Sequence, residues 1–292
     1  MEKKKVHLVL GSGGARGIAH IAVIEALEKD GYEIIEVIGC SMGAVVGGIY
    51  AAGHLSEYKK WLLSLTRSDV FELLDFTFTK TGFVKGEKLF AKHKEVTGDL
   101  YIENFKIPFT AVATDMKHNE EVYFRDGNLY TALRASVSIP GLFTPVVLGN
   151  KVLVDGGVLN PVPVNLVNKQ EDAIIVAVDL NARAEEKKLT ESSLNSEEEK
   201  EQKWYERLLP DQVLEFAKKQ DKQEEEAFSL LGLMESTFSF TQDRLTSLMF
   251  EMYKPEVRIN IPRNTCNTFD FYKAKEVYEA GINAYKKDMI QE

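Results

Sequence analysis

Residues 38–48 read IGCSMGAVVGG and place Ser41 between Gly39 and Gly43. The apolar run IIEVI before this stretch predicts a strand, and the small residues after it predict a helix that ends at Gly53. A nucleophile between a strand and a helix must lie on a tight, strained turn, where glycines two positions away on either side avoid collisions. The N-terminus of the helix also favours negative charge that develops on a reacting oxygen. We therefore predict that Ser41 is a catalytic nucleophile.

Strand and helix patterns alternate on both sides of this turn. Val6–Leu10 is a short apolar run, and Ile18–Lys29 repeats apolar residues at helical spacing. Further short apolar runs bounded by turn residues predict strands in IPFTAVATD, KVLVDGG and AIIVAVDL. Strands that alternate with helices indicate an α/β fold with a mainly parallel sheet and helices on both of its faces.

The chain changes character in its last third. Residues 183–254 begin with a charged stretch that has no apolar period, which predicts a mobile loop or a solvated helix. Two predicted helices follow, PDQVLEFAKK and MESTFSFTQDRLTSLMFEMY, as a C-terminal helical elaboration. Residues 255–292 predict a closing strand and helix. Because no repeat and no Pro/Gly-rich linker divides the chain, we expect a single domain over residues 1–292, with its catalytic core in residues 6–180.

Composition narrows the class of protein. The chain has 292 residues, 44% of them hydrophobic, which is enough for a sizeable core. Its net charge of −9 argues against nucleic acid as a partner and against attraction to anionic lipid headgroups. Cys40 and Cys266 cannot form a disulfide framework, and we expect Cys40 to pack into the sheet. Since the chain shows no signal peptide and no run near 18 apolar residues, we expect a soluble, cytoplasmic protein.

A serine nucleophile needs a base, and the order of residues argues against histidine. An α/β-hydrolase places its catalytic histidine late in the chain, yet no histidine follows His118. His7, His20 and His54 lie in or beside predicted strands and helices, where structural roles are more typical. The pattern therefore does not favour a histidine-dependent triad.

A carboxylate is the alternative base. Asp155 ends the predicted strand KVLVD and precedes Gly156 and Gly157, although Asp-Gly-Gly is also an ordinary turn. In a parallel sheet the strand ends gather at one edge, which is where Ser41 lies. A free aspartate has a pKa of about 3.9, and burial would raise it toward a value suited to a general base. We predict that Asp155 accepts the proton of Ser41.

The loop GSGGARG, residues 11–17, follows the first predicted strand and offers donors for an oxyanion. Gly13 and Gly14 can turn backbone N–H groups toward a bound carbonyl oxygen. Arg16 would either add positive charge near the oxyanion or hold the loop by its own hydrogen bonds. A dinucleotide fingerprint also fits a glycine-rich turn, but it requires an acid at the end of the second strand, and here Glu36 lies inside that strand.

Four stretches in this order, GSGGARG, GCSMG, ASVSIP and DGG, resemble the sequence blocks of the patatin-like phospholipases. The resemblance covers roughly residues 6–180 and implies a three-layer α/β fold. It also implies a Ser–Asp dyad that needs no histidine, metal or cofactor, with Ser41 as nucleophile and Asp155 as base. Gly13, Gly14 and Arg16 match the oxyanion loop. The supporting motif residues that the resemblance assigns are Gly11, Gly17, Gly39, Gly43, Gly156, Gly157, Ala135, Ser136 and Pro140.

The resemblance implies hydrolysis of fatty-acyl esters of lipids through an acyl-enzyme intermediate, as in a phospholipase A, lysophospholipase or esterase. The acidic charge disfavours anionic membranes, so we expect a lipid substrate and at most transient, peripheral membrane contact. A catalytically silent lipid-binding or regulatory module on the same fold is the main alternative. A nucleotide-dependent oxidoreductase is a further one.

Two apolar stretches offer surfaces for an acyl chain. Residues 70–86, VFELLDFTFTKTGFVKG, are dense in Phe and Leu and would form a lip over the serine. The Met- and Phe-rich helix at residues 234–253 would form a lid or a membrane-facing surface. For both stretches we favour burial in the core, since apolar residues at helical spacing usually pack inside.

Overall fold

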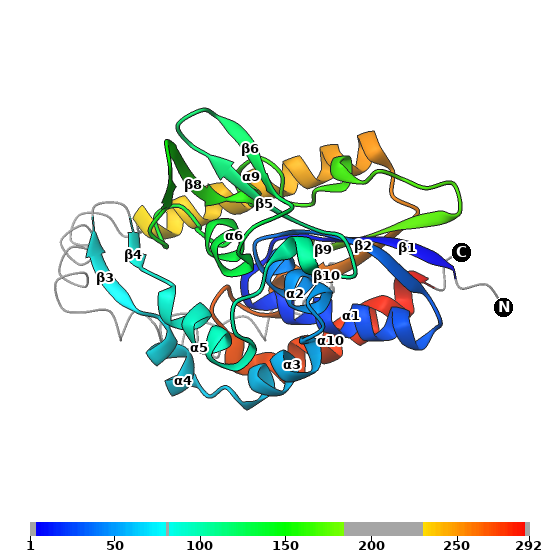
Figure 1. Cartoon of the computed structure of the whole chain (residues 1–292), viewed down its shortest axis with the longest axis horizontal. Helices are drawn as coiled ribbons and strands as arrows, with labels where there is room; N and C mark the ends of the chain where they lie inside the picture. The colour runs from blue at the N-terminus through cyan, green and yellow to red at the C-terminus, as the bar shows by residue number, and fades with distance from the viewer. Residues whose placement is uncertain (1–3, 80–81, 184–229, 290–292) are drawn as a thin grey trace, which may run out of the picture. The chain divides into compact units, whose positions relative to one another are not determined.

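The computed structural model describes residues 4–79, 82–183 and 230–289 (Figure 1). Contacts within the chain group it into two compact units, Met1–Arg183 with Phe240–Glu292, and Ala184–Ser239. The first unit holds the sheet and the candidate site and is described by itself. Most of the predicted charged loop and the predicted helix PDQVLEFAKK lie outside the described residues.

An eight-stranded sheet forms the centre of the first unit in the described part of the chain. Its strands run in the order β10-β9-β1-β2-β5-β8-β7, and β6 also pairs with β5. The strands β10, β9, β1, β2 and β5 are parallel neighbours, whereas β6 and β8 pair antiparallel with β5, and β7 pairs antiparallel with β8. This confirms the predicted mainly parallel α/β sheet. The bounds are β1 Lys5–Leu10, β2 Glu33–Cys40, β5 Phe109–Asp115, β6 Glu120–Phe124, β7 Val146–Leu148, β8 Lys151–Asp155, β9 Ala173–Ala182 and β10 Val257–Pro262.

Helices lie where the sequence predicts them at residues 18–29, directly after Ser41 and in the closing segment, and the structure adds helices between residues 55 and 136 that the sequence analysis did not predict. The described helices are α1 Ile18–Lys29, α2 Met42–Ala51, α3 Leu55–Ser64, α4 Arg67–Leu73, α5 Glu87–Thr97, α6 Leu129–Ser136, α9 Leu230–Tyr253 and α10 Ala274–Met289. A small hairpin of β3 Phe76–Thr79 and β4 Gly82–Val84 lies between α4 and α5. Among the residues that the structure describes, no helix combines the length and apolar character that a bilayer span requires.

Helices cover both faces of the sheet (Figure 1). Side chains alternate along β1, so Leu8 and Leu10 join the main core with α1, α2 and α10, while Val9 faces the other side. There Val9 packs in a second cluster with Phe250 of α9. The last turns of the Met- and Phe-rich helix therefore pack on the sheet, as we favoured. The helix also exposes Phe240 and Met252, whose relative accessibilities are 67% and 68%.

The prediction that Asp155 lies at the edge where parallel strands end is wrong in its reason, because β8 pairs antiparallel with β5. The parallel strand β2 runs along β5 as far as the pair Cys40–Val112. The antiparallel strand β8 runs the opposite way and stops at the pair Asp155–Ala113. The carboxylate thus reaches the level of the serine turn from the opposite direction.

The two strands meet end to end. β6 pairs along β5 at both Val112 and Ala113, so it occupies the whole of one edge there. A strand has two edges, which leaves β2 and β8 to share the other. Since Val112 and Ala113 are consecutive, the end of β2 at Cys40 faces the end of β8 at Asp155.

The packing of α10 on α1 gives a test of the fold. A β-carbon on Gly281 would lie 2.7 Å from the carbonyl oxygen of Ala19. Gly281→Ala should lower the free energy of unfolding by about 1–2 kcal/mol, since overpacking outweighs the roughly 1 kcal/mol of helix propensity that alanine adds. Urea unfolding measures this, with Asn283→Ala, an exposed change on the same helix, as the control. A variant at least as stable as the wild type would contradict the described helix contact.

Candidate active site

Ser41 lies on a strained turn between β2 and α2. Its backbone has φ 54° and ψ −123°, a conformation that residues other than glycine rarely adopt. A β-carbon on Gly39 would come within 2.5 Å of the Gly43 carbonyl, and one on Gly43 within 2.1 Å of the Leu10 carbonyl oxygen. The glycine spacing therefore has the steric cause that the sequence indicates, and the serine is held at the N-terminus of α2.

Asp155 lies beside Ser41 and is almost fully buried, with a relative accessibility of 1%. Its Oδ1 accepts a hydrogen bond of 2.7 Å from the amide of Gly157. Its Oδ2 is buried and, within the described chain, accepts no hydrogen bond of regular geometry. The Ser41 hydroxyl is nevertheless close enough to lower the pKa of this carboxyl. The structure thus brings the two predicted side chains together.

The environment of Asp155 raises the pKa of its carboxyl. Burial is the largest influence and raises its pKa to about 6, against the lowering effects of the Ser41 hydroxyl, the Gly157 amide and the Cys40 thiol. Cys40 is itself buried at the end of β2, and its Sγ lies 3.9 Å from Asp155 Oδ1. A carboxylate in this range is a better proton acceptor than an exposed one.

The ASVSIP block holds the backbone of both residues in place. The amide of Ser41 donates to Ser136 Oγ at 2.9 Å, and that hydroxyl donates to the Val112 carbonyl at 2.6 Å. The amide of Asp155 donates to the carbonyl of Ser138 at 2.9 Å. The block also includes Ala135, which is buried, and Pro140, which is half-buried. One short segment therefore contacts the backbone of both the serine and the aspartate.

The glycine-rich loop has two backbone amides, those of Gly13 and Gly14, that are free to bind a ligand. In the part of the chain that the structure describes, the N–H groups of Gly13 and Gly14 donate no hydrogen bond to another protein atom. Gly14 has φ +57°. Gly14 and Ser41 both line one apolar pocket, which is described below. These amides are suited to stabilising an oxyanion.

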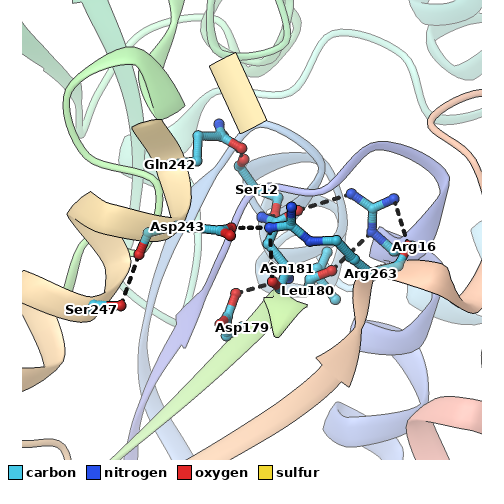
Figure 2. A network of polar contacts seen from close by, with 9 residues as sticks. All are labelled: Ser12, Arg16, Asp179, Leu180, Asn181, Gln242, Asp243, Ser247 and Arg263. Atoms are coloured by element: carbon cyan, nitrogen blue, oxygen red, sulfur yellow. Dashed lines mark hydrogen bonds and ion pairs between the residues drawn. The ribbon is translucent and has the colours of Figure 1, made fainter. Parts of the chain in front are cut away.

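Arg16 holds this loop, which is the second of its two predicted roles. Its guanidinium donates to the carbonyl of Leu180 at 2.8 Å and to Asn181 Oδ1 at 2.9 Å (Figure 2). It also donates to the carbonyl of Cys266 at 2.9 Å. These partners lie at the end of β9 and after β10. The side chain therefore links the loop to the C-terminal strands.

The remaining motif glycines lie where neighbouring atoms leave no space for a β-carbon. The atoms that such a carbon would meet, at 2.0–2.7 Å, are the Val178 carbonyl oxygen at Gly11, Met42 Cβ at Gly17, the Val112 carbonyl oxygen at Gly156 and Gln242 Nε2 at Gly157. Two of these contacts come from residues far along the chain. No local signal in the sequence could have identified them.

An apolar pocket opens at Ser41. Its walls include Trp61 and Leu62 from α3, and Phe143 from the segment before β7. Val70, Leu73 and Leu74 also line it, so the stretch over residues 70–86 contributes to the wall beside the serine, as the lip alternative describes. The segment after β10 also lines the pocket, through Thr268, Phe269 and Phe271. The sequence analysis did not predict this contribution.

His7 and His20 have structural partners. His7 Nδ1 lies 2.6 Å from Glu36 Oε2, and His20 Nε2 lies 2.9 Å from the Gly11 carbonyl. Burial lowers the pKa of His20 to about 4, so it is neutral at pH 7 and steadies the start of the glycine-rich loop.

One trio in the described residues, Asp115, His118 and Glu120, has possible metal-ligand atoms within 4.8 Å of one another. The carboxylate of Asp115 already accepts hydrogen bonds from the amides of Lys117 and Val152. It also contacts His118 Nδ1 at 2.5 Å. These contacts account for the trio as a capped turn between β5 and β6.

Known proteins share similarity with this chain in sequence and in structure. A family model described as patatin-like phospholipase matches residues 8–167, which include the glycine-rich loop, the serine turn and Asp155. An uncharacterized NTE family protein of Mycobacterium tuberculosis is 34% identical over 320 residues, covering 95% of this chain and 89% of that protein. Lysophospholipase NTE1 of Debaryomyces hansenii is 33% identical over 190 residues, covering 62% of this chain and 12% of that protein. The solved structure of VipD from Legionella pneumophila aligns with a TM-score of 0.44 and 14% identity, over 99% of this chain and 67% of that chain.

The buried carboxyl predicts a pH-dependent stability difference. Asp155 has a folded-state pKa of about 6 and an unfolded value of about 3.9, so ionisation costs stability progressively as the pH rises from about 4 to 6, and the cost is complete above 6. Asp155→Asn avoids that cost and can still accept the Gly157 bond. We expect it to be more stable than the wild type at pH 8, by up to about 3 kcal/mol.

Urea unfolding at pH 5 and pH 8 checks this prediction. The advantage of Asp155→Asn should be smaller at pH 5 than at pH 8, whereas Asp126→Asn, an exposed control, should show no such trend. An advantage that is equal at both pH values, or absent at pH 8, would contradict a buried carboxylate at position 155.

Proposed function

The chain belongs to the patatin-like phospholipase family, a family of lipid hydrolases, and we propose that it cleaves fatty-acyl esters through Ser41 and Asp155. One observation carries the proposal: the buried carboxyl of Asp155 adjoins the strained serine turn, and Ser41 lines an apolar pocket together with Gly14 of the glycine-rich loop. The name of the fungal relative, a lysophospholipase, supports lipids with a single acyl chain among the substrates.

In the first step the Ser41 oxygen attacks the ester carbonyl carbon while its proton passes to Asp155. The carbonyl oxygen becomes an oxyanion, which the amides of Gly13 and Gly14 stabilise by hydrogen bonds. The positive end of α2, beneath Ser41, adds to this effect. The carbon–oxygen bond to the alcohol then breaks, and Asp155 returns the proton to the leaving alkoxide. An acyl-enzyme and a free alcohol result.

In the second step water repeats the attack. A water molecule adds to the acyl carbonyl and gives its proton to Asp155, forming a second oxyanion at the same amides. The bond to the Ser41 oxygen breaks, and that oxygen regains the proton from Asp155. The fatty acid leaves, and both side chains return to their starting states. Each step is balanced by a single carboxyl that accepts and returns one proton.

The pocket supplies the acyl site in this proposal. Its walls are almost entirely aliphatic and aromatic, and they begin at Ser41 and Gly14, so a chain bound there would place its carbonyl at the reacting atoms. Burying each methylene of a chain contributes about 0.8 kcal/mol. Longer acyl esters should therefore bind more tightly until the pocket is filled.

The two reacting residues can be tested with a p-nitrophenyl ester series. Ser41→Ala should abolish turnover, and Asp155→Asn should lower kcat by about 10²–10⁴-fold, because general-base help is worth that much. A fluorophosphonate probe should label the wild type stoichiometrically at Ser41 and leave Ser41→Ala unlabelled. A silent lipid-binding module predicts no labelling and equally slow nitrophenolate release from all three proteins, and that result would sink the proposal.

The acyl site can be tested by narrowing the pocket. Leu74→Trp should raise KM for dodecanoyl esters by about tenfold while KM for acetyl esters stays within about twofold, because the larger side chain takes up pocket volume that a long acyl chain needs and an acetyl group does not. Leu63→Trp is the matched control, since Leu63 lies outside the pocket and is 45% exposed. Equal effects of Leu74→Trp on short and long esters would place the acyl chain elsewhere.

A further inference from the structure

We propose that Gln242 of α9 is a positioning residue for the oxyanion amides: it fixes Ser12, and through Ser12 the orientation of Gly13 and Gly14. The inference rests on the proposed function. Gln242 lies outside residues 8–167, the range that the family model matches.

Ser12 is fixed by three separate segments. Its amide donates to the carbonyl of Pro161 at 2.9 Å, and its carbonyl accepts from Asn181 Nδ2 at 2.9 Å. Its hydroxyl accepts from Gln242 Nε2 at 2.8 Å (Figure 2). Through its hydroxyl, Ser12 thus links α9 to the glycine-rich loop by a hydrogen bond.

The two free amides lie between two fixed residues. Ser12 precedes them, and on the other side the amide of Ala15 donates to the carbonyl of Thr268 at 2.9 Å. The intervening residues Gly13 and Gly14 are glycines, which have the widest backbone freedom. Their orientation therefore depends on the anchors at either end.

Gln242 also contacts the loop that follows the catalytic aspartate. Its Nε2 would lie 2.0 Å from a β-carbon at Gly157, where Asp155 Oδ1 and Ser12 Oγ would lie 3.0 and 3.1 Å away. The side chain is 4% exposed, and a buried amide is costly unless it is hydrogen-bonded. Gln242 thus occupies the junction of the oxyanion loop and the aspartate loop.

A neighbouring ion pair holds α9 at this junction. Asp243 contacts Arg263, and Arg263 donates to the carbonyl of Asn181 at 3.2 Å. Asn181 in turn bonds both Ser12 and Arg16 (Figure 2). The position of Gln242 is therefore set by the same network that anchors the loop.

The expected effect falls on kcat. Donors of an oxyanion stabilise charge that exists only in the transition state, so a small misalignment slows turnover without weakening ground-state binding. Losing such a donor outright costs about 10²–10³-fold, and misaligning it through Ser12 should cost less. We expect about a tenfold loss of kcat with KM unchanged within twofold.

The test uses Gln242→Met, which keeps the length of the side chain and removes the bond to Ser12. Besides the loss of kcat, a trifluoromethyl ketone should inhibit this variant about tenfold less tightly, because its adduct with Ser41 places an alkoxide at the same amides. Ser12→Ala removes the bond from the other side and should reproduce both effects. It decides the question if Gln242→Met does not fold.

Thr246→Val is the matched control on the same face of α9. Thr246 is 3% exposed, one turn from Gln242, and its hydroxyl has no hydrogen-bond partner in the described chain. It should keep kcat, KM and ketone inhibition at wild-type values. A similar loss of kcat in Thr246→Val would mean that the packing of α9 matters and the Gln242 amide does not.

The outcomes separate this inference from the proposed function. If the wild type neither hydrolyses esters nor is labelled at Ser41, the proposed function fails and the inference fails with it. If the wild type is active and both Gln242→Met and Ser12→Ala keep kcat within twofold, the inference alone fails. A rise in KM at constant kcat would also overturn it, since that pattern indicates a role in substrate binding.

Discussion

The end-to-end meeting of β2 and β8 on one edge of β5 is the constraint on which the candidate site depends. β2 stops at Cys40 and β8 stops at Asp155, at consecutive positions of β5. Neither strand can be extended without colliding with the other, so the chain must leave the sheet at this point in both. The serine and the aspartate are the residues at these exits, and their proximity follows from the topology of the sheet.

Hydrogen bonds to backbone groups then fix both exits. The ASVSIP segment bonds the amides of Ser41 and Asp155, and β9, the segment after β10, and α9 anchor the glycine-rich loop. The residues proposed for the chemistry come from the first part of the chain, but much of the scaffold that orients them comes from the last part. The helical and strand elements after residue 167 are therefore part of the site's architecture.

Local features of the site could be predicted from the sequence, whereas long-range ones could not. The serine turn depends on residues within a few positions of Ser41, and its glycine spacing was a reliable guide. Asp155 lies beside the serine turn, as predicted, but the predicted reason is wrong, because a single sequence does not show in which direction a strand enters a sheet. For Arg16 two roles stayed open, since the carbonyls that it binds lie far along the chain. The polar groups of α9 were overlooked beside its Met and Phe residues, although Gln242, Thr246 and Phe250 share a buried face at a spacing of four.

The contact between Gln242 and Gly157 has an evolutionary consequence. The amide nitrogen fills the space that a β-carbon at position 157 would need. A larger residue at 157 is tolerable only with a shorter one at 242, and a shorter residue at 242 leaves a void that a side chain at 157 can fill. Position 157 can therefore accept a larger residue only in a descendant of this chain in which the side chain at 242 has first become shorter.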